Sequence, residues 1–355
     1  MLYKDIYPLI ISFVNERATY SSILLTCKEW NFIAYKSLHL NFDIYYIASW
    51  ACDRGCLSLL NKLLEIGKID PTMNDQHLLN IACEKGHLNI VDRLLQCDNI
   101  DPSINDQEAF GDSLCDSNIC VVKRLLQCSN IDPSINHQYA IGYASRFGHH
   151  ELVKLLLQDP RVDPAIDDQI PLLYAAREGH IKIVKLLLKD PRVDPSEDSQ
   201  GAIKWASVNG HLQVVDLLLK DSRVDPSAGN QYAIRIASGN GHIKIVEALL
   251  KDKRVDPSVD NQRAIGRAAE NGHYEVVKRL LKDKRVDPSE NNQYAIKVAA
   301  YKGHFKIVKR LLKDKRVDPT DNNQEAYLSA LGHNHTEVVK LLLQDPRIGP
   351  FVNKF

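Results

Sequence analysis

Histidine and cysteine are the side chains of this sequence best suited to binding a metal ion. Cys52 and Cys56 stand four residues apart, and histidine follows glycine in one register at positions 87, 149, 180, 211, 242, 273 and 304. Ligands of a zinc ion lie about 2 Å from it, whereas equivalent positions in stacked helices lie about 8–10 Å apart. The spacing therefore predicts that these histidines bond to backbone near a turn between helices, and it predicts no metal site.

Signatures of catalysis are missing from the chain. Neither a phosphate-binding glycine loop nor a nucleophile elbow occurs in its 355 residues. The 45 aspartates and glutamates follow a repeating pattern, which is typical of helix caps and solvated faces. A catalytic site would need unlike groups that converge at one place. We therefore expect no enzymatic activity and no cofactor, and a function that depends on binding.

The composition is ordinary for a globular protein, with 44% hydrophobic and 25% charged residues. Lys+Arg and Asp+Glu both number 45, so the net charge does not favour nucleic acid as a partner. The first residues do not resemble a signal peptide, and no apolar run reaches the length of a membrane span. The eight cysteines fall within apolar helical patterns, so we expect buried, reduced thiols in a cytoplasmic monomer.

A constant period of 31 residues organises most of the chain. Asp-Pro begins at positions 70, 101, 132, 163, 194, 225, 256, 287 and 318, and glutamine follows in register at 76, 107, 138, 169, 200, 231, 262, 293 and 324. A fixed period between 20 and 50 residues predicts a solenoid, in which each repeat packs only against its neighbours.

Residues 256–286 illustrate one repeat. Asp256-Pro257 predicts a turn, and Asn261 is a candidate N-cap for a first helix. Gly272 ends that helix, and a second helix is expected from Tyr274 to Lys282. The inward faces are expected to consist of Ala264, Ile265, Ala268 and Ala269 in the first helix and Val276, Val277, Leu280 and Leu281 in the second. Neither helix is long enough to be stable alone, so the repeats must stack.

This pattern resembles the ankyrin repeat. The segments "AAENGHYEVVKRLL" at 268–281 and "AAREGHIKIVKLLL" at 175–188 carry the resemblance, which extends over residues 43–348 in ten repeats. It implies an all-α solenoid of helix-turn-helix units. The family's Thr-Pro-Leu-His is replaced, for example by "YAIR" at 232–235, and the period is 31 instead of 33, which implies a shortened finger loop. Residues 349–355 form a C-terminal tail.

Positions that vary between repeats are candidates for partner binding. One position of the first helix holds Tyr143, Tyr174 and Trp205 in consecutive repeats, and arginine lies three residues later at Arg146 and Arg177. Tyr139 and Phe147 flank this group. Tyrosine, tryptophan and arginine dominate binding hot spots, and the ankyrin resemblance implies that this helix lines a groove for a protein partner. The alternative is that the aromatic position packs half inside, since isoleucine and valine occupy it in other repeats.

Charge is distributed unevenly along the chain. Residues 235–316 contain 20 Lys+Arg and 10 Asp+Glu, a net charge of +10, so the remaining residues carry −10. Basic pairs recur at 253–254, 284–285 and 315–316 and are expected to form a ladder along one edge. Two interpretations remain open: the ladder attracts an acidic partner or RNA, or it is a solvated edge shared by recently copied repeats.

One repeat departs from the pattern. Within residues 107–126, Ser117-Asn118 replaces Gly-His, and Gly111-Asp112 falls inside the first helix. Glycine there weakens a helix by up to about 1 kcal/mol. The repeat is either a hinge or a decayed copy.

Residues 1–42 contain neither Asp-Pro nor Gly-His and resemble an F-box. The segment "LLTCKEWNFIA" at 24–34 corresponds to the Val-Cys-Lys-x-Trp signature of that family, although Tyr3 stands where proline is expected. The resemblance implies binding to a Skp1-type adaptor of a cullin ubiquitin ligase through Leu2, Ile6, Ile10, Leu24 and Trp30. The alternative is a helical cap, because the first repeat of a solenoid exposes an apolar face.

Together these features indicate a substrate-recruiting adaptor for ubiquitination, with an ankyrin scaffold or sequestering protein that has no ligase link as the alternative. Near-identical tandem repeats behind an F-box-like segment are similar to proteins of large DNA viruses of protists and of amoebae. In a viral protein, the expected compartment is the host cytoplasm.

Overall fold

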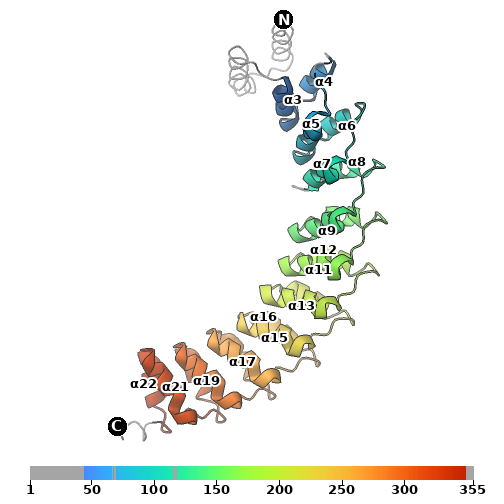
Figure 1. Cartoon of the computed structure of the whole chain (residues 1–355). Helices are drawn as coiled ribbons and strands as arrows, with labels where there is room; N and C mark the ends of the chain where they lie inside the picture. The colour runs from blue at the N-terminus through green and yellow to red at the C-terminus, as the bar shows by residue number, and fades with distance from the viewer. Residues whose placement is uncertain (1–43, 66, 68, 115–117, 349–355) are drawn as a thin grey trace, which may run out of the picture. The chain divides into compact units, whose positions relative to one another are not determined.

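The computed structural model describes residues 44–348 except 66, 68 and 115–117. All regular elements in this part of the chain are α-helices, arranged as ten pairs (Figure 1). The first helices of the pairs are α3 (Ile44–Asp53), α5 (Met73–Glu84), α7 (Ile104–Leu114), α9 (Ile135–Phe147), α11 (Ile166–Glu178), α13 (Glu197–Asn209), α15 (Ala228–Gly239), α17 (Val259–Glu270), α19 (Glu290–Tyr301) and α21 (Asp321–Gly332). The second helices are α4 (Leu57–Glu65), α6 (Leu88–Leu94), α8 (Ile119–Leu125), α10 (His150–Leu156), α12 (Ile181–Leu187), α14 (Leu212–Leu218), α16 (Ile243–Leu249), α18 (Tyr274–Leu280), α20 (Phe305–Leu311) and α22 (Thr336–Leu343).

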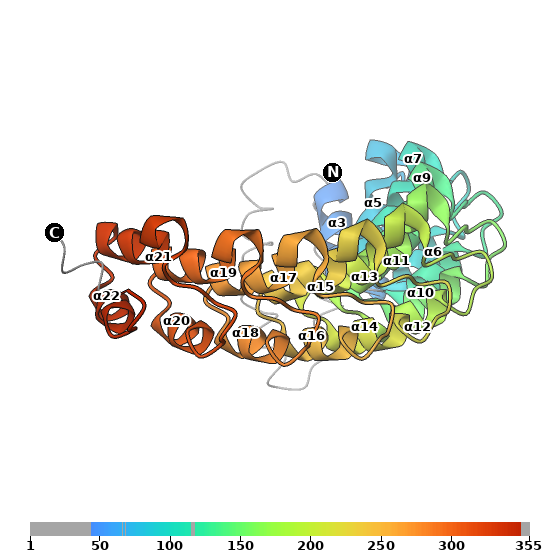
Figure 2. The ribbon, with the colours of Figure 1, turned by 90° about the horizontal axis from the view of Figure 1, so that it is seen from below.

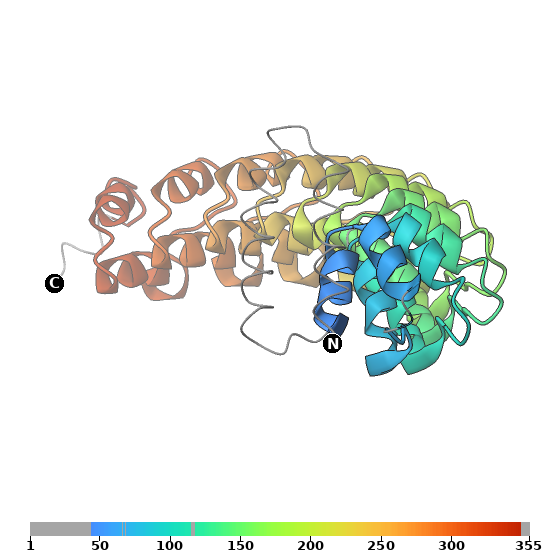
Figure 3. The same cartoon turned by 90° about the horizontal axis from the view of Figure 1, so that it is seen from above.

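The chain divides into two compact bodies. The N-terminal body comprises residues 1–140 and 158–162, and the C-terminal body comprises residues 141–157 and 163–355. In the C-terminal body, the first helices from α11 to α21 contact one another in sequence, and the second helices from α10 to α22 form a parallel row (Figure 2). In the N-terminal body, coloured blue to green in Figure 3, α3, α5 and α7 pack in one row and α4, α6 and α8 in another. The solenoid architecture is therefore confirmed in each body.

Small residues on the first helix and branched residues on the second helix form the core. In α17, Ala264, Ile265, Ala268 and Ala269 are at most 1% exposed, and in α18 the same holds for Val276, Val277 and Leu280. The expected inward faces are thus confirmed, except that Leu281 is only partly buried. Because α18 ends at Leu280, two residues before the predicted end, Leu281 falls in the turn that follows.

The predicted N-cap at Asn261 is wrong. Asp260, Asn261 and Gln262 adopt left-handed φ angles of 59°, 53° and 59°, so Asn261 lies within a left-handed turn and not at a helix start. Asn and Asp tolerate this conformation better than most residues. The turn directs Gln262, only 8% exposed, toward the next connector, where its side-chain amide donates to the Arg285 carbonyl at 3.4 Å. The recurring glutamine therefore links repeats.

Asp-Pro begins a turn that its own aspartate stabilises. The Asp256 carboxylate accepts hydrogen bonds from the backbone amide of Ser258 at 2.9 Å and from its hydroxyl at 2.7 Å. The same bonds recur at Asp287 and Ser289. Where the equivalent pair is Asp101 and Ser103, these bonds hold the pKa of the carboxyl below its usual value. The turn is thus set by an Asx interaction within the connector.

Glycine and histidine act together across neighbouring repeats. His273 Nε2 lies 2.9 Å from the Gly239 carbonyl, which belongs to the preceding repeat. Its ring also covers Gly241, where a Cβ atom would approach His273 Nδ1 to 2.5 Å. Gly241 has a φ of +78°, so any other residue there would be strained as well as crowded. Comparable histidine–carbonyl contacts occur at His87, His180, His211, His242, His304 and His335.

Two departures from the Gly-His pair follow from this arrangement. Asn118 replaces histidine but still donates from Nδ2 to the carbonyls of Cys83 and Glu84, at 3.1 and 2.9 Å. Asn334 precedes His335 in the position usually held by glycine and keeps a positive φ of 59°. The irregular repeat therefore retains the inter-repeat bond that its sequence had appeared to lose.

Candidate partner-binding surface

The predicted histidine role is confirmed for His87, His180, His211, His242, His273 and His304, which bond to backbone of the preceding repeat, and His335 makes the same contact. Within the part of the chain that the structure describes, no three His, Cys, Asp or Glu side chains are grouped closely enough to hold a metal ion.

The expectation of buried thiols holds for Cys52 and Cys83 but is wrong for Cys120, which is exposed. Burial raises the pKa of the Cys52 thiol to about 12, so this group is unreactive at neutral pH.

The first helices α11 and α13, together with the end of α9, present a continuous group of arginine and aromatic side chains. We call Tyr143, Arg146, Phe147, Tyr174, Arg177 and Trp205 the arginine–aromatic surface. All six belong to the C-terminal body. All six lie in the C-terminal half of the first helix of their repeat.

Arginines and rings alternate in this surface. The Arg146 guanidinium lies 5.5 Å from the Phe147 ring centroid and 5.7 Å from that of Tyr174, in the next repeat. The Arg177 guanidinium lies 5.3 Å from the Trp205 centroid, again one repeat further. Each arginine is thus positioned over an aromatic face of its neighbour, which reduces its freedom of movement before any partner arrives.

The exposure of these side chains suits recognition. Phe147 is 52% exposed and Trp205 is 41% exposed, whereas Tyr143 and Tyr174 are half-buried. Arg146 and Arg177 are exposed, and Arg177 also pairs loosely with Glu178 at 3.5 Å. The aromatic position therefore packs half inside in two repeats and projects into solvent at Trp205, so the alternative of half-inside packing holds at Tyr143 and Tyr174, and partner binding stays a prediction.

Tyr139, on α9, is 53% exposed and belongs to the N-terminal body. Leu2, Ile6, Ile10, Leu24 and Trp30, the residues expected to meet a Skp1-type adaptor, lie outside the described residues.

The basic ladder is only partly available to a partner. Arg285 donates from Nε and Nη2 to both carboxylate oxygens of Asp283, at 3.0 and 2.8 Å, and from Nη1 to the Val255 carbonyl at 2.7 Å. Hydrogen bonding to the Arg285 guanidinium lowers the pKa of the Asp283 carboxyl. Arg254 and Arg316 make the same bonds to Asp252 and Asp314. The arginines are thus structural, while the neighbouring Lys253, Lys284 and Lys315 are exposed.

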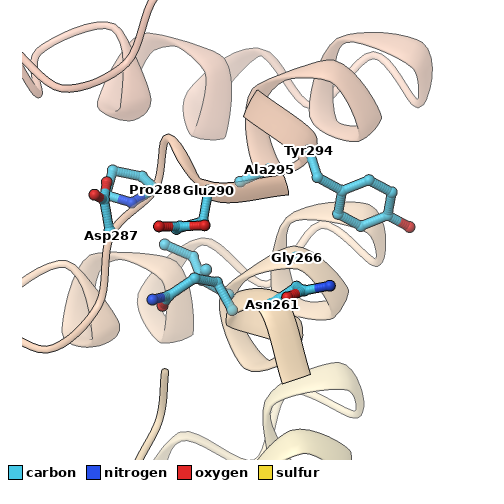
Figure 4. Close-up of a pocket in the computed structure, with 9 residues that line it drawn as sticks. Asn261, Gly266, Asp287, Pro288, Glu290, Tyr294 and Ala295 are labelled. Carbon is cyan, nitrogen blue, oxygen red and sulfur yellow. The ribbon is translucent and has the colours of Figure 1, made fainter. Parts of the chain in front are cut away.

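A crevice between α17 and α19 is lined by nine residues, among them Gly266, Pro288 and Tyr294 (Figure 4). Its space of about 170 Å³ includes open solvent, and almost none of it is enclosed. Small-molecule sites usually enclose about 300–1,000 Å³, so this crevice is too small for one.

No helix among the described residues has both the length and the apolar character needed to cross a membrane.

Comparison with known families agrees with this architecture. A family model for ankyrin repeats, three copies long, matches residues 113–199, 203–292 and 265–354. These matches cover well over half of the chain. The chain belongs to the ankyrin-repeat family. A search of curated proteins finds no match. Ankyrin repeats generally act as protein-protein interaction modules and not as enzymes, and this ankyrin-repeat chain is accordingly an interaction module that binds protein partners.

Sequence reasoning missed two features of the ankyrin stack. One is the arginine–aspartate pair of each connector, whose signal is the recurring Asp-x-Arg spacing at 252–254, 283–285 and 314–316. The other is His335, which follows Asn334 instead of glycine and therefore falls outside the Gly-His pattern.

Proposed function

We propose that this ankyrin-repeat protein is a substrate-recruiting adaptor for a Skp1-cullin-type ubiquitin ligase. In this proposal, the arginine–aromatic surface binds the substrate protein, and the F-box-like residues 1–42 bind the Skp1-type adaptor. The repeats at 43–348 then form the substrate-binding domain, and 349–355 a tail.

The observation that carries substrate binding is the stacking of Arg146 and Arg177 on rings of the following repeats, at 5.7 and 5.3 Å. Stacked arginines keep their edge N–H groups available to a partner's carboxylate or carbonyl. The exposed rings of Phe147 and Trp205 add apolar contact area, and such a combination is typical of interface hot spots. A protein partner is therefore favoured over a small molecule.

The observation that carries the ligase link is the sequence "LLTCKEWNFIA" at 24–34 together with Leu2, Ile6 and Ile10. The alternative function is an ankyrin scaffold or sequestering protein, in which residues 1–42 act only as a cap of the stack. Both functions use the same arginine–aromatic surface, so only the N-terminal segment separates them.

A co-purification experiment tests the two parts separately. The full chain is used as bait, and both a Skp1-type adaptor and the captured substrate protein are measured. Arg177→Ala combined with Trp205→Ala should lose the substrate by at least about tenfold and retain the adaptor. Ile10→Ala combined with Trp30→Ala should do the reverse.

Tyr274→Ala combined with Lys278→Ala provides a matched control, because it removes a cation–aromatic pair of similar distance, 5.8 Å, from a second helix. This control should retain both partners. Failure of the wild-type chain to bind the adaptor would refute the ligase link and leave the scaffold function. Equal loss of substrate in the control would refute the arginine–aromatic surface.

A further inference from the structure

The connectors of the C-terminal body carry arginines and lysines, and these two cations have different roles. Arg254, Arg285 and Arg316 each bind an aspartate within the connector and a backbone carbonyl of the preceding repeat. Their donors are therefore largely occupied. Lys253, Lys284 and Lys315 precede these arginines, are exposed, and form no ion pair with any described residue.

The three lysines occupy one register of three successive repeats, whose second helices α16, α18 and α20 pack in order (Figure 2). We call them the lysine row. A second exposed lysine, two residues earlier in each connector, accompanies the row at Lys251, Lys282 and Lys313. The position equivalent to Lys253, Lys284 and Lys315 is proline or serine in the flanking connectors of the same body, at Pro191, Ser222 and Pro346. The row is therefore confined to one part of the stack.

Charge in this region is in excess and is not cancelled locally. Residues 235–316 hold 20 Lys+Arg against 10 Asp+Glu. The connector aspartates Asp252, Asp283 and Asp314 are bound to arginine and are only 15–17% exposed, so they offer no ion pair to the lysines. An approaching acidic group would meet the lysines first.

The step between repeats favours one kind of partner. Stacked helices are about 8–10 Å apart. An extended polyproline-type segment rises about 3.1 Å per residue with three residues per turn, so every third side chain lies on one face at steps of about 9 Å. A carboxylate at every third residue would therefore match successive lysines.

We propose that the lysine row is a docking surface for an extended acidic segment of a protein partner, with aspartate or glutamate at every third residue. This surface goes beyond the proposed function, because it involves connectors that are separate from the arginine–aromatic surface. Nucleic acid is less suited to it, since single strands bind through exposed aromatic stacking platforms. The nearby rings of Tyr274 and Phe305 instead lie beneath Lys278 and Lys309, at 5.8 and 5.7 Å.

Fluorescence anisotropy with the full chain tests this surface. The probe is a labelled proline-rich peptide with aspartate at every third position. Two competitors are a peptide of the same composition with its aspartates consecutive, and an oligouridylate. The row variant combines Lys253→Gln, Lys284→Gln and Lys315→Gln. The control variant combines Lys182→Gln, Lys185→Gln and Lys244→Gln, which removes three exposed lysines of the same body and the same total charge.

The row variant should bind the spaced peptide at least about tenfold more weakly than wild type, and the control variant within about twofold. Added salt should weaken wild-type binding, because the lysines are exposed. The proposal is overturned if wild type does not bind the spaced peptide, or if both variants lose binding equally. It is also overturned if the consecutive-aspartate peptide or the oligouridylate binds as tightly as the spaced peptide.

Discussion

At the scale of single residues, the same side-chain type serves different ends in this protein. Arg146 and Arg177 lie over the rings of Tyr174 and Trp205, whereas Arg285 is held by Asp283 and a backbone carbonyl. The difference arises from position, because a connector arginine meets an aspartate two residues earlier and a helix-end arginine does not. Residue type alone therefore does not distinguish a structural cation from a binding one.

Asp112 offers a pH-dependent test of the irregular repeat. Burial, together with the charges of Glu108 and Glu84, raises the pKa of its carboxyl to about 6, against a smaller opposing effect of His77. A raised pKa in the folded state means that the ionised form of Asp112 destabilises folding, so the contribution of this group to stability is fully present below its unfolded pKa and is lost as pH rises through about 6. Asp112→Asn should therefore stabilise the chain at pH 7 by about 1 kcal/mol, after solvent screening is considered.

Chemical denaturation of both proteins across the pH range measures this effect. The two unfolding free energies should converge as the pH falls to about 3, below the ordinary aspartate pKa of about 3.9, where Asp112 is protonated in both folded and unfolded chains. A stability difference that does not change with pH would contradict the assignment.

At the scale of helices, each repeat is completed by its neighbour. The histidine of one repeat bonds to a carbonyl of the repeat before it and covers that repeat's glycine. Neither helix of a pair exceeds 13 residues, and helices of this length are marginal alone. The Gly-His pair is therefore a contact between repeats as much as a turn within one.

Gly241→Ala tests this contact. The new methyl group would meet the His273 ring and the residue would keep a φ near +78°, so we expect a loss of about 2 kcal/mol or more. Thermal or urea unfolding measures the change. Gly332→Ala is the matched control, because its Cβ would meet nothing within 4 Å and its φ is not positive. Similar destabilisation in both variants would argue against the proposed contact between the His273 ring and Gly241.

At the scale of the whole molecule, the described chain consists of two bodies, and in each body the main contacts between repeats join neighbours. In such an array, stability is approximately a sum of repeat and interface contributions. The effects of two substitutions on the free energy of unfolding should thus be non-additive in adjacent connectors and additive in distant ones. The connector arginines allow a direct test, since Arg285 donates to Val255, which directly follows Arg254.

A double-mutant cycle measures this coupling. Arg285→Ala alone should cost about 1–2 kcal/mol through loss of its charged hydrogen bonds, and exposed Lys284→Ala should change stability by less than about 0.5 kcal/mol. Arg254→Ala with Arg285→Ala should be non-additive by more than about 0.5 kcal/mol, whereas Arg223→Ala with Arg347→Ala should be additive within that limit. Equal coupling in both pairs would contradict the nearest-neighbour description.

The sequence by itself determined the architecture of this protein. The 31-residue period, the alanine and leucine patterns and the Gly-His turns depend on local chemistry, so the helix pairs, their cores and the histidine–backbone bonds could be predicted. The arginine–aromatic group could also be selected from its variation between repeats, although not its stacking.

Only the tertiary structure decided which of the repeated polar side chains are hydrogen-bonded within the protein. Asn261 was expected to cap a helix, but the left-handed turn instead buries Gln262 against the next connector. Arg285 was expected to form part of a basic ladder with Lys284, but its guanidinium bonds to a carbonyl 30 residues earlier. These partners are brought together by stacking of successive repeats, and a pattern within one repeat does not contain that information.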